Sequence, residues 1–84
     1  MKVMRYRTDE GVFTVLLVKT GNKWAQVMFM DAAGIRIKRV PVADIERYMW
    51  ELECYPLQRA VRRFRAAGKR FGITGGAKQA LKGV

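Results

Sequence analysis

The sequence contains no histidine, a single cysteine and no acidic residue after Glu53. Without histidine the chain lacks the commonest general base and metal ligand, and the lone Cys54 can form neither an internal disulfide nor a zinc site. Its paired acids stand one or two residues apart, so their side chains point in different directions and form no catalytic dyad. The pairs are Asp9/Glu10, Asp44/Glu46 and Glu51/Glu53. We therefore expect a protein that is not an enzyme and has no cofactor or metal.

Long apolar runs are also missing. No run is longer than Val15–Val18, which is far too short to span a bilayer, and Met1–Arg5 lacks the apolar core of a signal peptide. A lone cysteine is typical of a reducing compartment. We therefore expect the 84 residues to form one small domain, residues 1–84, in the cytoplasm and without a membrane partner.

Positive charge is abundant and unevenly placed. The chain has 17 Lys and Arg against seven acids, a net charge of +10. The segment Tyr55–Val84 holds eight of these cations and no acid, hence +8 of the +10. Such an asymmetry indicates a polyanionic partner, nucleic acid before an acidic protein.

Residues 2–41 have the pattern of short strands joined by glycine-containing turns. The expected strands are Lys2–Thr8, Val12–Thr20, Lys23–Met30 and Ile35–Val40. The second is apolar on both faces, which is typical of a strand covered on both sides or wrapped within a barrel. Since four strands leave two bare edges, we expect an antiparallel meander curled into a small SH3-like barrel. A flat sheet with a helix across one face is the alternative.

After Pro41 the periodicity becomes helical. In residues 42–53 the side chains of Ile45, Tyr48, Met49 and Leu52 are spaced at i, i+3, i+4 and i+7. We expect an acidic helix here, which caps the barrel.

The C-terminal segment, residues 56–84, begins a second helical pattern. Pro56 suits the first helical position, and the helix is expected to run from Leu57 to about Arg70. At about 100° per residue the apolar side chains form one stripe and every cation falls outside it. The stripe consists of Leu57, Ala60, Val61, Phe64, Ala67 and Phe71. The fold class is thus α+β, with an amphipathic basic helix docked by its apolar edge.

The cations of this helix are the candidate binding residues. A solvated helix face usually mixes charges of both signs, whereas here like charges stand three and four residues apart with no acid among them. Five of the eight cations are arginine, whose planar fork suits phosphate. The candidates are Arg59, Arg62, Arg63, Arg65, Lys69, Arg70, Lys78 and Lys82, with Arg36 and Lys38 as secondary contacts.

The stretch from Ala66 to Leu81 resembles the centre of a helix-turn-helix motif. The motif has, in order, a small residue in the first helix, a glycine in the turn, a hydrophobic residue after it and a residue that caps the recognition helix. These positions are occupied here by Gly68, Gly72, Ile73 and Thr74. The resemblance implies that Lys78, Gln79 and Lys82 reach towards DNA. The sequence departs from the motif at Lys78, where an apolar residue is usual, and at Gly75 and Gly76, which weaken a helix. A glycine-rich turn followed by a frayed basic terminus is the alternative.

Three stretches together resemble short basic proteins encoded by phages of actinobacteria. They are GVFTVLLVKTGNKWAQVMF, GIRIKRVPVADIERY and YPLQRAVRRFRAAGKRFGIT. The resemblance implies a phage origin and action in the host cytoplasm, but no specific activity.

The leading hypothesis is a nucleic-acid-binding protein, with DNA preferred over RNA. The candidates for base stacking are Tyr6, Trp24 and Phe29. The alternative is an adaptor or inhibitor that binds an acidic surface of a host protein; an exposed Trp50 or Met49 beside the basic helix would favour it. A third interpretation is a structural virion or nucleoid component that forms oligomers through an open sheet edge.

Overall fold

The structure is a computed structural model that describes residues 1–84 and consists of a five-stranded antiparallel sheet and three helices. Four strands form the predicted meander, each within one residue of its expected bounds: β1 (Lys2–Thr8), β2 (Gly11–Thr20), β3 (Trp24–Asp31) and β4 (Gly34–Pro41). A fifth strand, β5 (Met49–Glu51), joins the free edge of β1. The order across the sheet is therefore β4-β3-β2-β1-β5.

The expected acidic helix over residues 42–53 is half its predicted length. Helix α1 covers only Ala43–Tyr48, and the prediction was wrong for the remainder. The helical spacing of Met49 and Leu52 gives way because residues 49–51 pair with Tyr6, Arg5 and Met4, which satisfies the otherwise bare edge of β1. Pairing also buries Met49, which is only 7% exposed.

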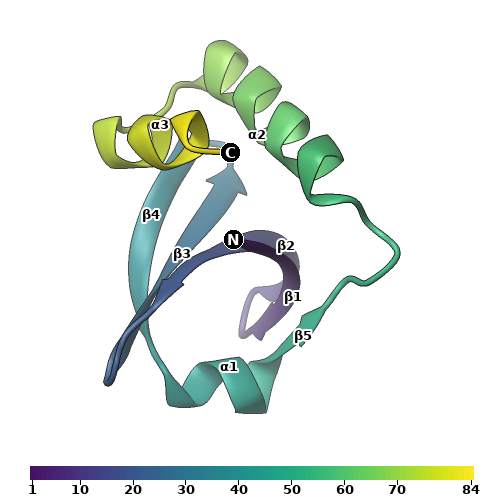
Figure 1. Cartoon of the computed structure of the whole chain (residues 1–84), viewed down its shortest axis with the longest axis vertical. Coiled ribbons are helices and arrows are strands. Elements are labelled where there is room, and N and C mark those ends of the chain that lie inside the picture. The colour runs from purple at the N-terminus through teal and green to yellow at the C-terminus, as the bar shows by residue number, and fades with distance from the viewer.

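The sheet is not closed, because its edge strands β4 and β5 do not pair with each other. The expected barrel is therefore not confirmed. Helices α2 (Leu57–Phe71) and α3 (Gly75–Lys82) lie across one face of the curled sheet, and α1 lies at the opposite end of the molecule (Figure 1).

Alternating side chains give the sheet an apolar cluster on each face. On the face below α2 and α3 is the helix-side core: Val3, Leu16, Met28, Ile35, Ala60, Val61, Phe64, Ala77 and Leu81. On the other face is the α1-side core: Met4, Tyr6, Val15, Ala25, Val27, Val40 and Met49. The neighbours Val15 and Leu16 are both fully buried, one in each core, which confirms that the second strand is covered on both sides.

The turn between α2 and α3 is attached to the edge of β4. The Ile35 amide donates to the Gly72 carbonyl at 2.9 Å, and the Thr74 amide donates to the Ile35 carbonyl at 3.0 Å. Residue 73 thereby forms a parallel bridge with Ile35. Gly34, with φ at +113°, permits this approach, because a Cβ there would clash with the Gly72 carbonyl. The sheet edge thus fixes where both helices lie.

None of the three helices has the length and apolar character needed to cross a membrane.

Candidate nucleic-acid interface

Helix α2 docks through the predicted apolar stripe, with one exception. Ala60, Val61 and Phe64 are buried, and Leu57 and Ala67 are half-buried. Phe71, the last residue of α2, was expected in the stripe but is 52% exposed. Pro56 precedes the first helical residue and accepts the amides of Arg59 and Ala60, so it is the N-cap and not the first helical position.

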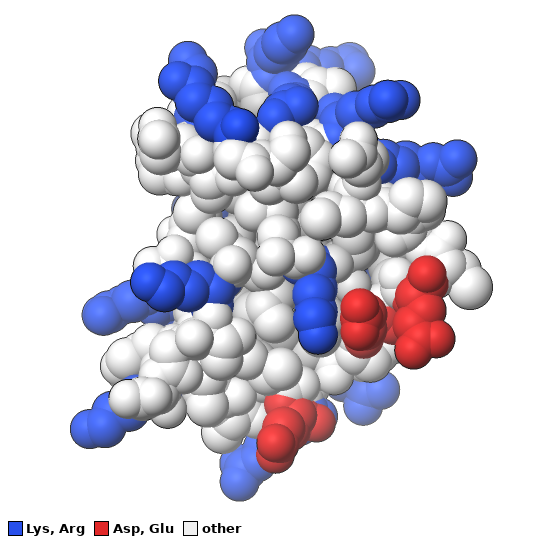
Figure 2. Space-filling view, viewed as in Figure 1, with Lys and Arg blue, Asp and Glu red and all other residues white.

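The cations of α2 form an arc with two flanks. Arg59, Arg63 and Arg70 follow one side of the helix at intervals of four and seven residues, and Arg62, Arg65 and Lys69 follow the other. All six are exposed. Figure 2 shows blue side chains gathered over the top of the molecule, where Figure 1 places α2 and α3, while the red side chains lie lower down.

Helix α3 forms despite its two leading glycines. Thr74 is its N-cap, and its hydroxyl accepts the amide of Ala77 at 3.5 Å, as the sequence predicts. Ala77 and Leu81 are buried in the helix-side core. The segment is therefore a docked helix and not a frayed terminus.

A groove of ≈ 320 Å³ lies between α2 and α3. Four cations surround it, two from each helix, above a floor that includes Gly68, Ile73 and Leu81; the cations are Arg65, Lys69, Lys78 and Lys82. Ile73 packs closely on Gly68, where a Cβ would come within 3.2 Å of the Ile73 Cβ. Lys78, at the position where the helix-turn-helix pattern usually has an apolar residue, lines this groove and is exposed.

The turn differs from the resemblance in two respects. Gly72 has φ at +104° and ψ at 157°, which lies outside the left-handed helical region typical of a glycine that ends a helix. Ile73 pairs with β4 as well as packing on α2, so the sheet helps to set the position of α3.

Arg65 differs from the other cations of the C-terminal segment because its guanidinium has a structural partner. Its Nη2 donates to the Leu81 carbonyl at 2.5 Å and to the Val84 oxygen at 3.4 Å. These bonds connect α2 to the end of α3. The other seven cations of the segment make no side-chain hydrogen bond or ion pair within the chain, so they are available to an external anion.

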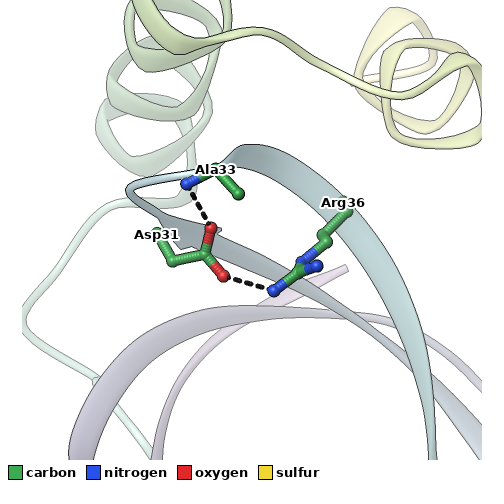
Figure 3. Close-up of polar contacts among 3 residues, drawn as sticks. All are labelled: Asp31, Ala33 and Arg36. Atoms are coloured by element: carbon green, nitrogen blue, oxygen red, sulfur yellow. Dashed lines mark hydrogen bonds and ion pairs between the residues drawn. The ribbon is translucent and has the colours of Figure 1, made fainter.

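Arg36 and Lys38 are not part of this surface. Their cross-strand partners, Phe29 and Val27, place them on the face of the sheet opposite α2 and α3. Arg36 Nη2 donates to Asp31 Oδ2 at 2.7 Å, the chain's one salt bridge (Figure 3). The Ala33 amide, first, and then Arg36 lower the pKa of Asp31 below its usual range. Arg36 is thus already paired with an acid. The Nζ atom of Lys38 lies 5.1 Å from the Phe29 ring centre.

Of the three aromatic residues predicted as stacking candidates, only Trp24 is exposed. Its exposure is 48%, and the Arg39 guanidinium lies 5.2 Å from its ring centre. Tyr6 is buried and Phe29 half-buried, with their ring centres 5.9 Å apart.

A second basic and aromatic group, not predicted from the sequence, lies on the helix side of the sheet. Trp50 of β5 is 43% exposed, pairs across the strands with Arg5, and has the Arg7 guanidinium 5.7 Å from its ring centre. Arg5 in turn lines a cavity with Arg63 of α2. The alternation within residues 2–8 places Arg5 and Arg7 on one face of a strand. The helical spacing of residues 42–53 gave no sign that Trp50 would pair with that strand.

No group of three His, Cys, Asp or Glu side chains is placed to hold a metal ion. No protein-family model matches the chain, and neither the curated proteins nor the solved structures include a match.

Proposed function

We propose that this protein is a non-enzymatic nucleic-acid-binding protein of the cytoplasm, with DNA preferred over RNA. The observation that supports the proposal is the exposed cationic surface of α2 and α3, which has seven unpaired cations and no acid. Phosphate neutralisation by Lys and Arg provides most of the affinity in such complexes. Three guanidinium groups on one flank and the lysine-lined groove on the other can follow a phosphate backbone.

The structure changes which of the predicted residues we propose as phosphate contacts. Arg65 acts mainly as a tether for α3, and Arg36 and Lys38 lie on the other face of the sheet. We assign the phosphate contacts to the remaining candidates: Arg59, Arg62, Arg63, Lys69, Arg70, Lys78 and Lys82. The strong curl of the sheet around two cores is compatible with the SH3-like arrangement, which we retain as a proposal for the fold.

The test is fluorescence anisotropy with labelled duplex DNA, single-stranded DNA and RNA over a series of salt concentrations. The variant Arg62→Glu/Arg63→Glu should weaken binding at least about tenfold, because two phosphate contacts become repulsive. The matched control is Lys19→Glu/Lys23→Glu, which changes the net charge by the same amount at the β2–β3 turn. This turn lies near α1, because the Lys23 carbonyl accepts the amide of Val42, the residue before α1. Absence of binding at low salt by the folded protein would overturn the proposal.

The exposed Trp50 favours a second candidate, an adaptor or inhibitor that binds an acidic surface of a host protein. Tryptophan amid arginine is typical of the central residues of protein interfaces. Met49, the other residue that would have favoured this candidate, is buried. A host protein retained by the wild type and lost with Trp50→Ala, in the absence of nucleic-acid binding, would support it.

A further inference from the structure

One end of the helix side of the sheet is left uncovered by α2. Four side chains face this side because they alternate with Met4, Tyr6 and Val15 of the α1-side core and with Phe13, which packs against that core; they are Arg5, Arg7, Val12 and Thr14. Val12 remains 40% exposed. This uncovered area, formed by β1, β2 and β5, borders the flank of α2 that carries Arg59 and Arg63.

A cavity of ≈ 190 Å³ lies where this area meets α2. Its apolar walls include Met30, Tyr55 and Phe64, and its two guanidinium groups belong to Arg5 of the sheet and Arg63 of the helix. Arg5 Nη1 donates to Thr14 Oγ1 at 3.1 Å, which orients the guanidinium and leaves its other N–H groups without a partner in the chain. A cavity that combines apolar side chains with two cations fits a flat ring that has an anion attached.

A second site for a ring lies next to the cavity. Trp50 is the cross-strand partner of Arg5, so its indole is one strand spacing away, and Arg7 lies against the same indole. Neither Arg5, Arg7 nor Arg63 is in a salt bridge. The neighbouring acid, Glu51, pairs with Met4 and so belongs to the opposite face of the strand.

We propose that this area, from the Arg5/Arg63 cavity to Trp50, binds an unpaired segment of nucleic acid. One base enters the cavity, the next stacks on Trp50, and Arg5, Arg7 and Arg63 hold the phosphates between and beside them. The inference rests on the proposed function and specifies its ligand class as single-stranded DNA or RNA. In a duplex the base faces are stacked on one another, so a duplex can use the cations but neither the cavity nor the indole.

The first test compares one labelled oligothymidylate, alone and as a duplex with its complement, by anisotropy. We expect tighter binding of the single strand, weakened about tenfold by Trp50→Ala, since base–aromatic stacking contributes on the order of tenfold in affinity or more per base. Duplex affinity should not change. The matched control is Trp24→Ala, because Trp24 is equally exposed and also lies against an arginine, but at the other end of the strands. Trp24→Ala should change neither affinity.

The second test uses intrinsic fluorescence and does not depend on a destabilising substitution. In Trp24→Phe the only indole is Trp50, and its emission should be quenched as the single strand is added. In Trp50→Phe the remaining Trp24 should respond little. Circular dichroism checks that each variant is folded.

The outcomes separate the two proposals. Equal affinity for strand and duplex, with no effect of Trp50→Ala and no quenching, would overturn the single-strand inference and leave the phosphate-binding function intact. Failure of the wild type to bind either form would overturn both. If Trp50→Ala instead abolished only the capture of an acidic protein, the area would be a protein-docking surface and the inference would be wrong.

Discussion

Arg65 of α2 donates a hydrogen bond from Nη2 to the carbonyl oxygen of Leu81, near the C-terminus of α3, at 2.5 Å. The last carbonyls of a helix have no partner within the helix and carry partial negative charge, so a guanidinium is a favourable donor there. Leu81 itself is buried against α2. One arginine of the basic helix therefore helps to hold α3 in place, while its neighbours remain free.

This bond gives Arg65 a structural role, whereas we propose that the neighbouring cations bind phosphate. We expect Arg65→Ala to lower the free energy of unfolding by about 1–2 kcal/mol, since a partly exposed, charge-assisted hydrogen bond is lost. Arg62→Ala, on the same helix and without a hydrogen bond in the chain, should change it by less than about 0.5 kcal/mol. Urea unfolding followed by circular dichroism measures both. Equal losses in the two variants would contradict the tethering role.

The close approach of Gly34 and Gly72 leads to a second prediction. Gly11 and Gly34 both have positive φ, but a Cβ at Gly11 meets nothing within 4 Å, whereas one at Gly34 meets the Gly72 backbone. Gly11→Ala should therefore cost only the conformational strain, about 1 kcal/mol. Gly34→Ala should cost about 3 kcal/mol or more, because the α2–α3 turn must also move. Chemical denaturation of the two variants tests the difference, and similar losses would show that the approach is not tight.

The parts of the fold that could be predicted from sequence are those set by local patterns. The four strand bounds follow from alternation and glycine turns, α2 from its apolar stripe, and the start of α3 from Thr74. These signals lie within a few residues of the structure that they specify. The exposure of the cations could also be predicted, because an apolar stripe on one side of a helix docks against the core and leaves the polar side chains of the other side in solvent.

The parts that could not be predicted depend on partners far away in the chain. Strand β5 exists because β1 offers an unpaired edge more than forty residues earlier, from Met4 to Tyr6. The hydrogen bond from Arg65 to the Leu81 carbonyl joins α2 to α3, and the edge of β4 sets the relative position of these two helices. Likewise, only the pairing of β5 with β1 brings Trp50 beside Arg5 and reveals the second basic surface.

The buried phenol of Tyr6 provides a pH-dependent prediction. Burial, and then its 2.6 Å hydrogen bond to Asp44, raise the pKa of Tyr6 to about 12. Since the pKa is higher in the folded state, the neutral phenol contributes stability that is fully present below pH 10.0, the usual pKa, and is lost as the pH rises through about 12. We expect alkaline titration of tyrosinate absorbance to show a late step that Tyr6→Phe removes.

The same variant tests the hydrogen bond at neutral pH. Tyr6→Phe should lower the free energy of unfolding by about 1–2 kcal/mol, because Asp44 loses a donor. Tyr48→Phe is the control, since Tyr48 is 45% exposed and its hydroxyl makes no hydrogen bond in the chain. A curve for Tyr6→Phe that loses amplitude near the usual pKa of 10.0 and keeps the late step would contradict the raised pKa of Tyr6.

The lysines of α3 distinguish a surface made by α2 alone from one that includes the groove between the helices. If Lys78 and Lys82 each neutralise a duplex phosphate, Lys78→Gln/Lys82→Gln should reduce the steepness of log affinity against log salt by about 1.8, or roughly 0.9 per phosphate. Both side chains are exposed on a helix whose buried residues, Ala77 and Leu81, are untouched, so folding should be preserved. Lys19→Gln/Lys23→Gln removes the same charge at the β2–β3 turn and should leave the slope unchanged. An equal slope in wild type and the α3 variant would restrict the phosphate-binding surface to α2.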